Sequence, residues 1–179
     1  MKAGQITFVG ILAAALIAGG YLLYLASRAL PLPGGKLLVM APYLALAMSV
    51  AKRELNTAWT MTLVSLVLGV LLSAFTPLMG ASILASGVLS DGSARLIPGR
   101  ASSSLRIILS AAVYPAWGLA IWLAISNYLT GNLLLDTFGY GPLLGAVALA
   151  YLLGVGGALM GLKIASRLRM GGRLPRGGR

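Results

Sequence analysis

The side chains that could carry out catalysis are few. The chain of 179 residues has no cysteine and no histidine, and its only carboxylates are Glu54, Asp91 and Asp136. It therefore offers no thiolate nucleophile, no Ser-His-Asp set and no cluster of ligands for a catalytic metal. The glycine-rich run Gly154–Gly157 lacks the Lys-Ser/Thr pair of a phosphate loop. We therefore interpret its glycines as sites of close helix packing. We expect neither an enzyme nor a bound cofactor or metal.

A second set of side chains could recognise a ligand without reacting with it. Aromatic rings provide stacking area, and asparagine amides orient a ligand through donors and acceptors. The candidates for substrate binding are the aromatic and amide residues Trp117, Trp122, Asn127, Tyr43 and Tyr140, together with the cations Arg28 and Lys36. The Pro/Gly-rich loop between those cations could close over a pocket as a lid and bring them to an anionic ligand. The alternative is an aromatic belt, with the cations at lipid headgroups.

The composition indicates where these residues must lie. The chain is 59% hydrophobic and 9% charged, whereas soluble domains are about 45–50% apolar and about 25% charged. Such a chain cannot cover a water-soluble surface, and it is too apolar to be disordered. We therefore expect a multi-pass protein of the cell membrane. Its net charge of +11 is explained by the anionic cytoplasmic leaflet, so no nucleic-acid partner is needed.

Uncharged stretches predict the membrane helices. One stretch, residues 55–90, spans 36 residues and would be roughly 54 Å long as a single helix, which is too long for one crossing. Proline 77 divides this stretch, because proline removes a backbone donor and disfavours helix in the residue before it. The sequence thus predicts an all-α bundle of six transmembrane helices. Four lie at about Gln5–Ala26, Leu37–Ala51, Thr57–Phe75 and Leu78–Ser90, and the last two lie within the uncharged stretches 107–135 and 137–162, joined by a loop that contains Asn132, Asp136 and Tyr140.

The distribution of Lys and Arg predicts the orientation of this bundle. With six crossings and a cytoplasmic N-terminus, only two of the 14 basic residues, Arg28 and Lys36, lie outside. The other twelve lie inside, as the positive-inside rule requires, and both termini are cytoplasmic. On this topology Asp91–Ser104 is a cytoplasmic loop. Residues 1–169 form the membrane domain, and the basic residues 170–179 form a disordered tail.

The first predicted helix carries a row of small residues on one face, Gly10, Ala14 and Ala18. Small residues at this spacing let membrane helices approach closely. The row could pack inside the bundle or form a docking face for a partner subunit, and the residues alone leave both possibilities open.

Three features together resemble the substrate-binding S components of energy-coupling factor (ECF) transporters. The row Ala14-xxx-Ala18 is similar to the docking motif of that family. The segment Ser82–Ile97 (SILASGVLSDGSARLI) is similar to its small-residue fourth helix ending in a cytoplasmic Asp, and Gly157–Arg169 (GALMGLKIASRLR) to its basic sixth-helix exit.

The resemblance implies a role in uptake. S components bind a vitamin or related micronutrient at the extracellular side and work with a membrane T component and cytoplasmic ATPases. They would deliver the ligand by toppling in the membrane, driven by ATP hydrolysis in those partners. No vitamin-specific signature identifies the ligand.

Two other functions remain open. An accessory or scaffold subunit of a larger membrane complex would need the small-residue faces but no pocket. A small channel would need a polar path through the bilayer, and the predicted helices contain Ser and Thr but no continuous charged path.

Overall fold

The computed structural model describes residues 3–27, 35–55, 57–97, 103–129, 131 and 137–171. Within these residues the regular structure is entirely helical. The long helices are α1 (Ala3–Ala26), α2 (Gly35–Leu55), α3 (Thr60–Ser73), α4 (Pro77–Arg95), α5 (Ser103–Tyr128) and α7 (Tyr140–Gly171). The all-α prediction is confirmed.

Four of these helices, α1, α2, α5 and α7, are long and apolar enough to cross a membrane. The helix α3 is apolar but has only 14 residues, and α4 ends in the polar sequence Asp-Gly-Ser-Ala-Arg. The described part of the chain therefore has the helices of a membrane protein, and four of them are both long and apolar enough to span the bilayer.

Several helix boundaries differ from the predicted ones. The helix α2 extends to Leu55, into the polar segment, so its uncharged stretch underestimated its length. The loop predicted at Asp91–Ser104 is wrong in its first part, because α4 continues through Asp91 to Arg95. The helix α5 begins at Ser103, before the uncharged stretch 107–135, because a charge near a membrane boundary, here Arg106, does not itself end a helix. It ends at Tyr128. The tail beyond residue 171 lies outside the described residues.

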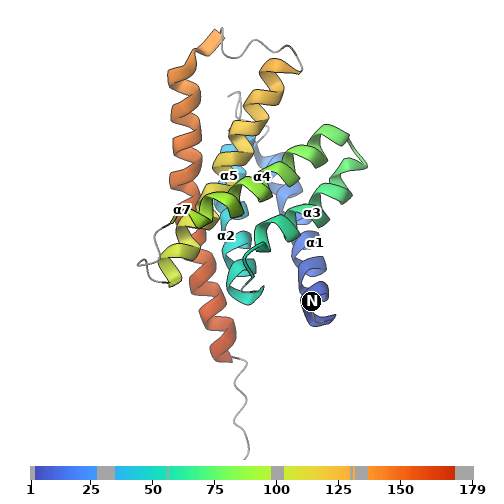
Figure 1. The fold of residues 1–179 in the computed structure, drawn as a ribbon, viewed down its shortest axis with the longest axis vertical. Coiled ribbons are helices and arrows are strands. Elements are labelled where there is room, and N and C mark those ends of the chain that lie inside the picture. The colour runs from blue at the N-terminus through green and yellow to red at the C-terminus, as the bar shows by residue number, and fades with distance from the viewer. Residues whose placement is uncertain are drawn as a thin grey trace, which may run out of the picture.

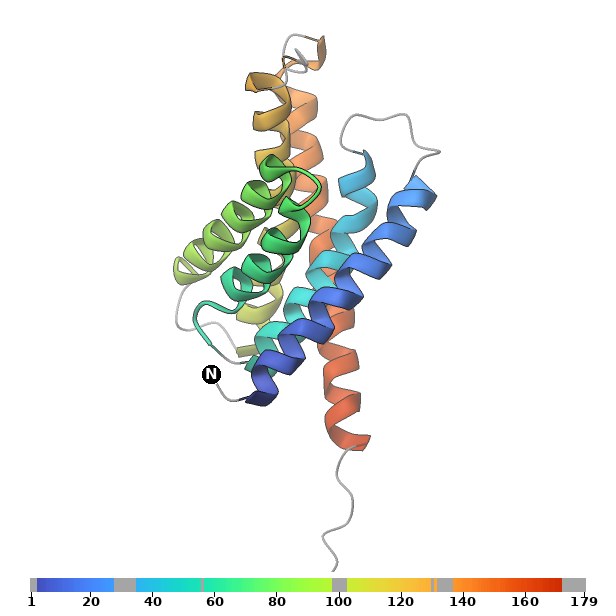
Figure 2. The same cartoon turned by 90° about the vertical axis from the view of Figure 1, so that its right-hand side faces the viewer.

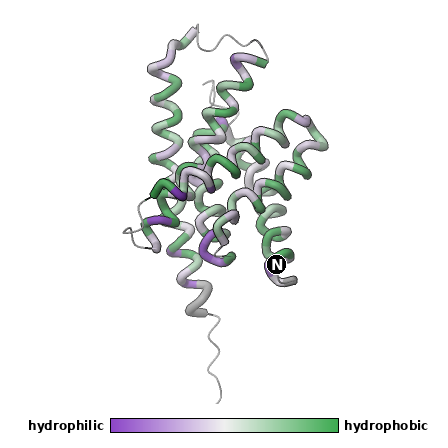
Figure 3. Tube along the Cα trace, viewed as in Figure 1, coloured by the Kyte–Doolittle hydropathy of each residue, from purple (hydrophilic) through white to green (hydrophobic). Residues whose placement is uncertain are grey.

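The helices run alternately up and down the molecule (Figures 1 and 2). The start of α1, the ends of α2, α4 and α7 and the start of α5 point to one side, and the α3–α4 turn points to the other. We call the first side the basic end, because it carries Lys52, Arg53, Arg95, Arg106, Lys163 and Arg167. Its hydrophilic segments are visible where α2 and α4 end and α5 begins (Figure 3).

Glycines allow α7 to lie directly against α2. A Cβ atom added at Gly157 would overlap the carbonyl oxygen of Pro42, and one added at Gly161 would lie 2.6 Å from the carbonyl oxygen of Leu46. Small residues bring membrane helices together in this way, so the packing interpretation of this glycine-rich segment is confirmed. The neighbouring Gly156 faces open space.

The helices α3 and α4 form a tightly packed hairpin. A Cβ atom at Gly69 of α3 would lie 2.9 Å from the carbonyl oxygen of Gly80 in α4. Proline 77 begins α4, a position where its missing N–H has no intrahelical acceptor in any case. The hairpin packs against α5 through α4, and α3 packs more closely against α4 than against α1 or α2. Its turn points away from the basic end and projects to the side of the long helices (Figure 1).

Candidate functional site

A buried carboxylate lies at the basic end of the hairpin. Asp91 of α4 is 1% exposed, and its Oδ2 atom accepts hydrogen bonds from the backbone N–H of Thr62 (2.8 Å) and from the Thr62 hydroxyl (2.9 Å). The N-cap residue of α3, Trp59, provides no side-chain cap. Asp91 therefore satisfies one of the free N–H groups at the start of α3, where the helix dipole favours a negative charge.

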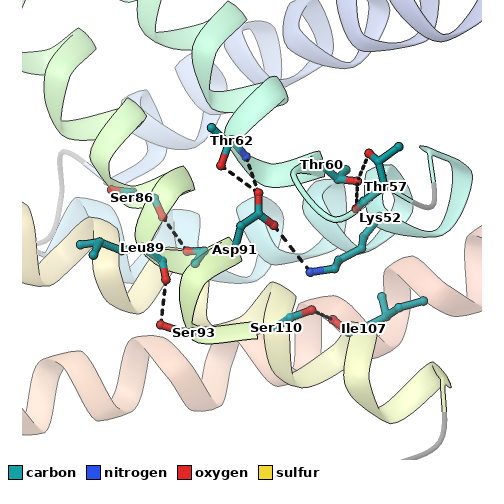
Figure 4. Close-up of polar contacts among 11 residues, drawn as sticks. Lys52, Thr57, Thr60, Thr62, Ser86, Leu89, Asp91, Ser93, Ile107 and Ser110 are labelled. Carbon is teal, nitrogen blue, oxygen red and sulfur yellow. Dashed lines mark hydrogen bonds and ion pairs between the residues drawn. The ribbon is translucent and has the colours of Figure 1, made fainter. Parts of the chain in front are cut away.

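Lys52 of α2 is the counter-ion of this carboxylate. Its Nζ atom lies 3.7 Å from Asp91 Oδ1, which has no hydrogen-bond partner among the described residues. Figure 4 shows Asp91 between Thr62 and Lys52. A buried charge is costly unless it is paired and hydrogen-bonded, and this carboxylate is both. We call Lys52, Thr62 and Asp91 the Asp91 cluster; it connects α2, α3 and α4.

Other polar contacts support the same end of the bundle. The guanidinium of Arg95 lies over the ring of Trp59, 4.2 Å from its centroid. Arg53 donates a hydrogen bond to the carbonyl oxygen of Leu162 in α7 (2.9 Å). In the interior, the Ser65 hydroxyl donates to the Tyr114 hydroxyl (3.0 Å), which connects α3 to α5. The first contact closes the base of the hairpin, the second joins α2 to α7, and the third attaches the hairpin to α5.

Chemically, the Asp91 cluster is suited to holding helices together. Its carboxylate lies beside an ammonium group and accepts hydrogen bonds from two donors on another helix. The described residues contain no group of three metal-ligating side chains. Sequence reasoning missed this cluster, because it placed Asp91 in a loop. The sequence did contain a signal for the cluster, because Asp91 directly follows an uncharged segment rich in small residues. An ionisable residue in such a position marks a functional or structural site.

The predicted substrate-binding residues lie on several helices. The ring nitrogen of Trp117 donates a hydrogen bond to the Ser93 hydroxyl of α4 (2.9 Å). The Tyr43 hydroxyl donates to the carbonyl oxygen of Ala15 in α1 (2.6 Å), and its ring packs over Gly19. Tyr43 thus joins α2 to α1, and Trp117 joins α5 to α4. Each has a packing role that a ligand-binding role would have to share.

The remaining predicted residues lie toward the other end of the bundle. Asn127 is half-buried near the end of α5, Trp122 is exposed, and Tyr140 is 70% exposed at the start of α7. Lys36 lies in the first turn of α2, with its Nζ atom 4.7 Å from the ring centroid of Tyr24. Arg28 lies outside the described residues. Lys36 contacts α1, Tyr43 contacts α1 and Trp117 contacts α4, so the shared pocket stays a prediction.

The small-residue row of α1 lies on an exposed face. Gly10, Ala14 and Ala18 are exposed, whereas Val9, Ala13 and Leu16 are buried against the bundle. A Cβ atom at Gly10 would meet nothing within 4 Å. Within the described residues the row therefore does not pack inside this chain.

The chain matches no protein-family model, no curated protein and no solved structure, so its function has to be argued from its own residues.

Proposed function

We propose that the chain is the membrane-embedded substrate-binding subunit of an ATP-driven importer of the ECF type, capturing a small micronutrient at the extracellular side. The observation that carries the proposal is the exposed row Gly10, Ala14 and Ala18, which suits close approach by a helix of another subunit. An importer whose own chain has no residues for ATP hydrolysis needs partners that carry out that reaction. Those partners are a membrane T component and cytoplasmic ATPases.

The docking face is tested by a double substitution on α1 and a single control substitution beside it. Replacing Ala14 and Ala18 with leucine should abolish co-purification with an ATPase-containing complex from native membranes, because bulky side chains keep the partner helix away. The isolated protein should keep its melting temperature. The matched control, Ala13→Leu, enlarges a buried neighbour and should lower that temperature. Unfolding of the Ala14/Ala18 variant would show that the row packs internally.

The proposed orientation places both termini in the cytoplasm, and it is tested by thiol labelling. The chain has no cysteine, so each variant carries a single reactive group. Cysteines at Ala29 and Thr137 should react with an impermeant maleimide added to intact cells, and those at Thr57 and Ser103 should react only in inverted vesicles. Outside labelling at Ser103 contradicts this orientation.

The proposed pocket is tested by ligand affinity. Trp117 and Asn127 combine stacking area with an amide, so Trp117→Ala and Asn127→Ala should each weaken binding by roughly tenfold to a hundredfold, or about 1–3 kcal/mol. The ligand is first found in a thermal-shift screen of water-soluble vitamins. Trp59→Ala, at the basic end, is the control and should leave affinity unchanged. Parent-like binding by both test variants would remove them from the site.

An accessory or scaffold subunit is the second candidate function, because an exposed small-residue face also suits a permanent membrane complex. It predicts stable co-purification with a complex that lacks ATPases, and no thermal shift with any compound in the vitamin screen.

A further inference from the structure

The length of the α3–α4 hairpin is at odds with a full crossing. The 14 residues of α3 extend about 21 Å along the helix axis, whereas the hydrocarbon core of a bilayer is about 30 Å thick. The helix α4 is longer, but its last turns contain Asp91 and Arg95. Neither helix meets the length and apolarity of the four long ones. A hairpin with its base at one membrane surface would therefore end before the other surface.

The base of the hairpin has the residues of a membrane surface. Trp59 precedes α3 and stacks under Arg95 at the end of α4, and Thr57 and Thr60 share a hydrogen bond beside them. Tryptophan is enriched at membrane interfaces, and arginine extends its charge toward water there. These residues lie at the basic end, where Thr57 and Thr60 are near Lys52 (Figure 4). The base of the hairpin thus has the residues that suit the headgroup level of the basic side.

The tip of the hairpin is apolar and exposed. Phe75 is 78% exposed, and Val70, Leu71, Leu78 and Met79 are also exposed. No charged residue occurs in the 36 residues from 55 to 90. In water such a tip would present a large apolar patch, which soluble surfaces avoid. Its side chains suit lipid acyl chains.

The backbone of the turn is also suited to hydrocarbon. The N–H groups of Phe75 and Thr76 donate to the carbonyl oxygen of Leu72, and those of Met79 and Gly80 donate to that of Thr76. Proline 77 has no N–H to satisfy. Backbone groups without partners cost several kcal/mol in lipid, so a turn there must satisfy them internally. A turn in water would not need this arrangement.

The distribution of charge agrees with a hairpin that returns to the side from which it entered. A hairpin that ends inside the bilayer leaves its two flanks on the same side, as two full crossings would. The division of basic residues into twelve and two is therefore unchanged, with four complete spans instead of six. The positive-inside rule cannot distinguish the two arrangements, whereas the short α3 and the charged last turns of α4 favour the hairpin.

From these observations we infer that α3 and α4 form a re-entrant hairpin, anchored at the basic membrane surface by Trp59 and Arg95, with its tip at Phe75–Met79 in contact with lipid acyl chains. The inference requires a membrane-embedded chain and no particular ligand or transport partner.

The experiment uses single cysteines in the full-length protein, at Phe75 and Thr76 in the tip and at Thr137 and Ser103 as controls. Neither tip position should react with an impermeant maleimide from either side of the membrane, and both should react in detergent. A nitroxide attached at each tip position, after reconstitution in phospholipid vesicles, should collide frequently with oxygen and rarely with a water-soluble nickel chelate.

Labelling of the tip from the side that labels Thr137 would overturn the re-entrant hairpin in favour of two crossings. A nitroxide shielded from both oxygen and nickel would overturn the lipid contact, because it would lie buried in protein. If Thr137 and Ser103 label from the same side, the proposed orientation fails, and the collision measurements at the tip still decide the hairpin.

Discussion

Replacing Gly157 with alanine should separate α7 from α2 and lower the melting temperature of the purified protein by roughly 5 °C or more. The added Cβ atom would overlap the carbonyl oxygen of Pro42. A backbone atom cannot rotate away, so one helix must move. Such overpacking typically costs about 1–3 kcal/mol, and here it acts on the closest contact between two long helices. Thermal unfolding in detergent, followed by circular dichroism, measures the change.

The next residue along the same helix provides the control. A Cβ atom at Gly156 would meet nothing within 4 Å, and alanine is a better helix former than glycine by about 1 kcal/mol. Gly156→Ala should therefore leave the melting temperature unchanged or raise it slightly. Equal losses in the two variants would show that helix propensity or lipid packing, rather than contact with Pro42, controls stability here.

Asp91→Asn should destabilise the protein by about 2–3 kcal/mol. The amide oxygen can still accept hydrogen bonds from Thr62, so the substitution removes mainly the charge that faces Lys52. Removing one partner of a fully buried ion pair costs about 3–5 kcal/mol, and the partial exposure of Lys52 reduces this cost. Asp91→Leu should cost more, because it also leaves the N–H of Thr62 without its acceptor.

A double-mutant cycle isolates the ion pair. Lys52→Met combined with Asp91→Asn should cost less than the sum of the single losses, with a coupling energy of about 1–3 kcal/mol. Lys163→Met removes an exposed lysine of α7 and is the matched control, with an expected change within about 0.5 kcal/mol. Additive losses at Lys52 and Asp91 would show that the two groups act independently. Denaturant titration in mixed micelles measures all the variants.

The sequence was sufficient for the features that depend on local pattern. Uncharged stretches and the proline at position 77 predicted where the helices lie, because hydrocarbon tolerates neither charges nor open backbone. The close packing of the Gly154–Gly157 region also followed from residue type.

Features that depend on distant partners could not be predicted. Asp91 is stabilised by Lys52 and Thr62, which lie on two other helices, so nothing near it in the sequence indicated that α4 continues past it. The orientation of α1 was ambiguous for a different reason. The exposed face of α1 carries Ile11 and the buried face carries Leu16. Because both faces are apolar, the sequence pattern does not show which face of α1 packs against the bundle and which faces lipid. The contact between Trp117 and Ser93 likewise depends on how α4 crosses α5.

The capping of α3 by Asp91 constrains the order in which the chain is built into the membrane. The acceptor lies 29 residues after the N–H group that it satisfies, so the start of α3 has no cap while the ribosome is still producing α4. At the headgroup level water can satisfy the N–H of Thr62 until Asp91 has been made, so the start of α3 exchanges a water contact for the carboxylate only after most of α4 exists. The α3–α4 hairpin therefore reaches its final packing as a pair, not one helix at a time.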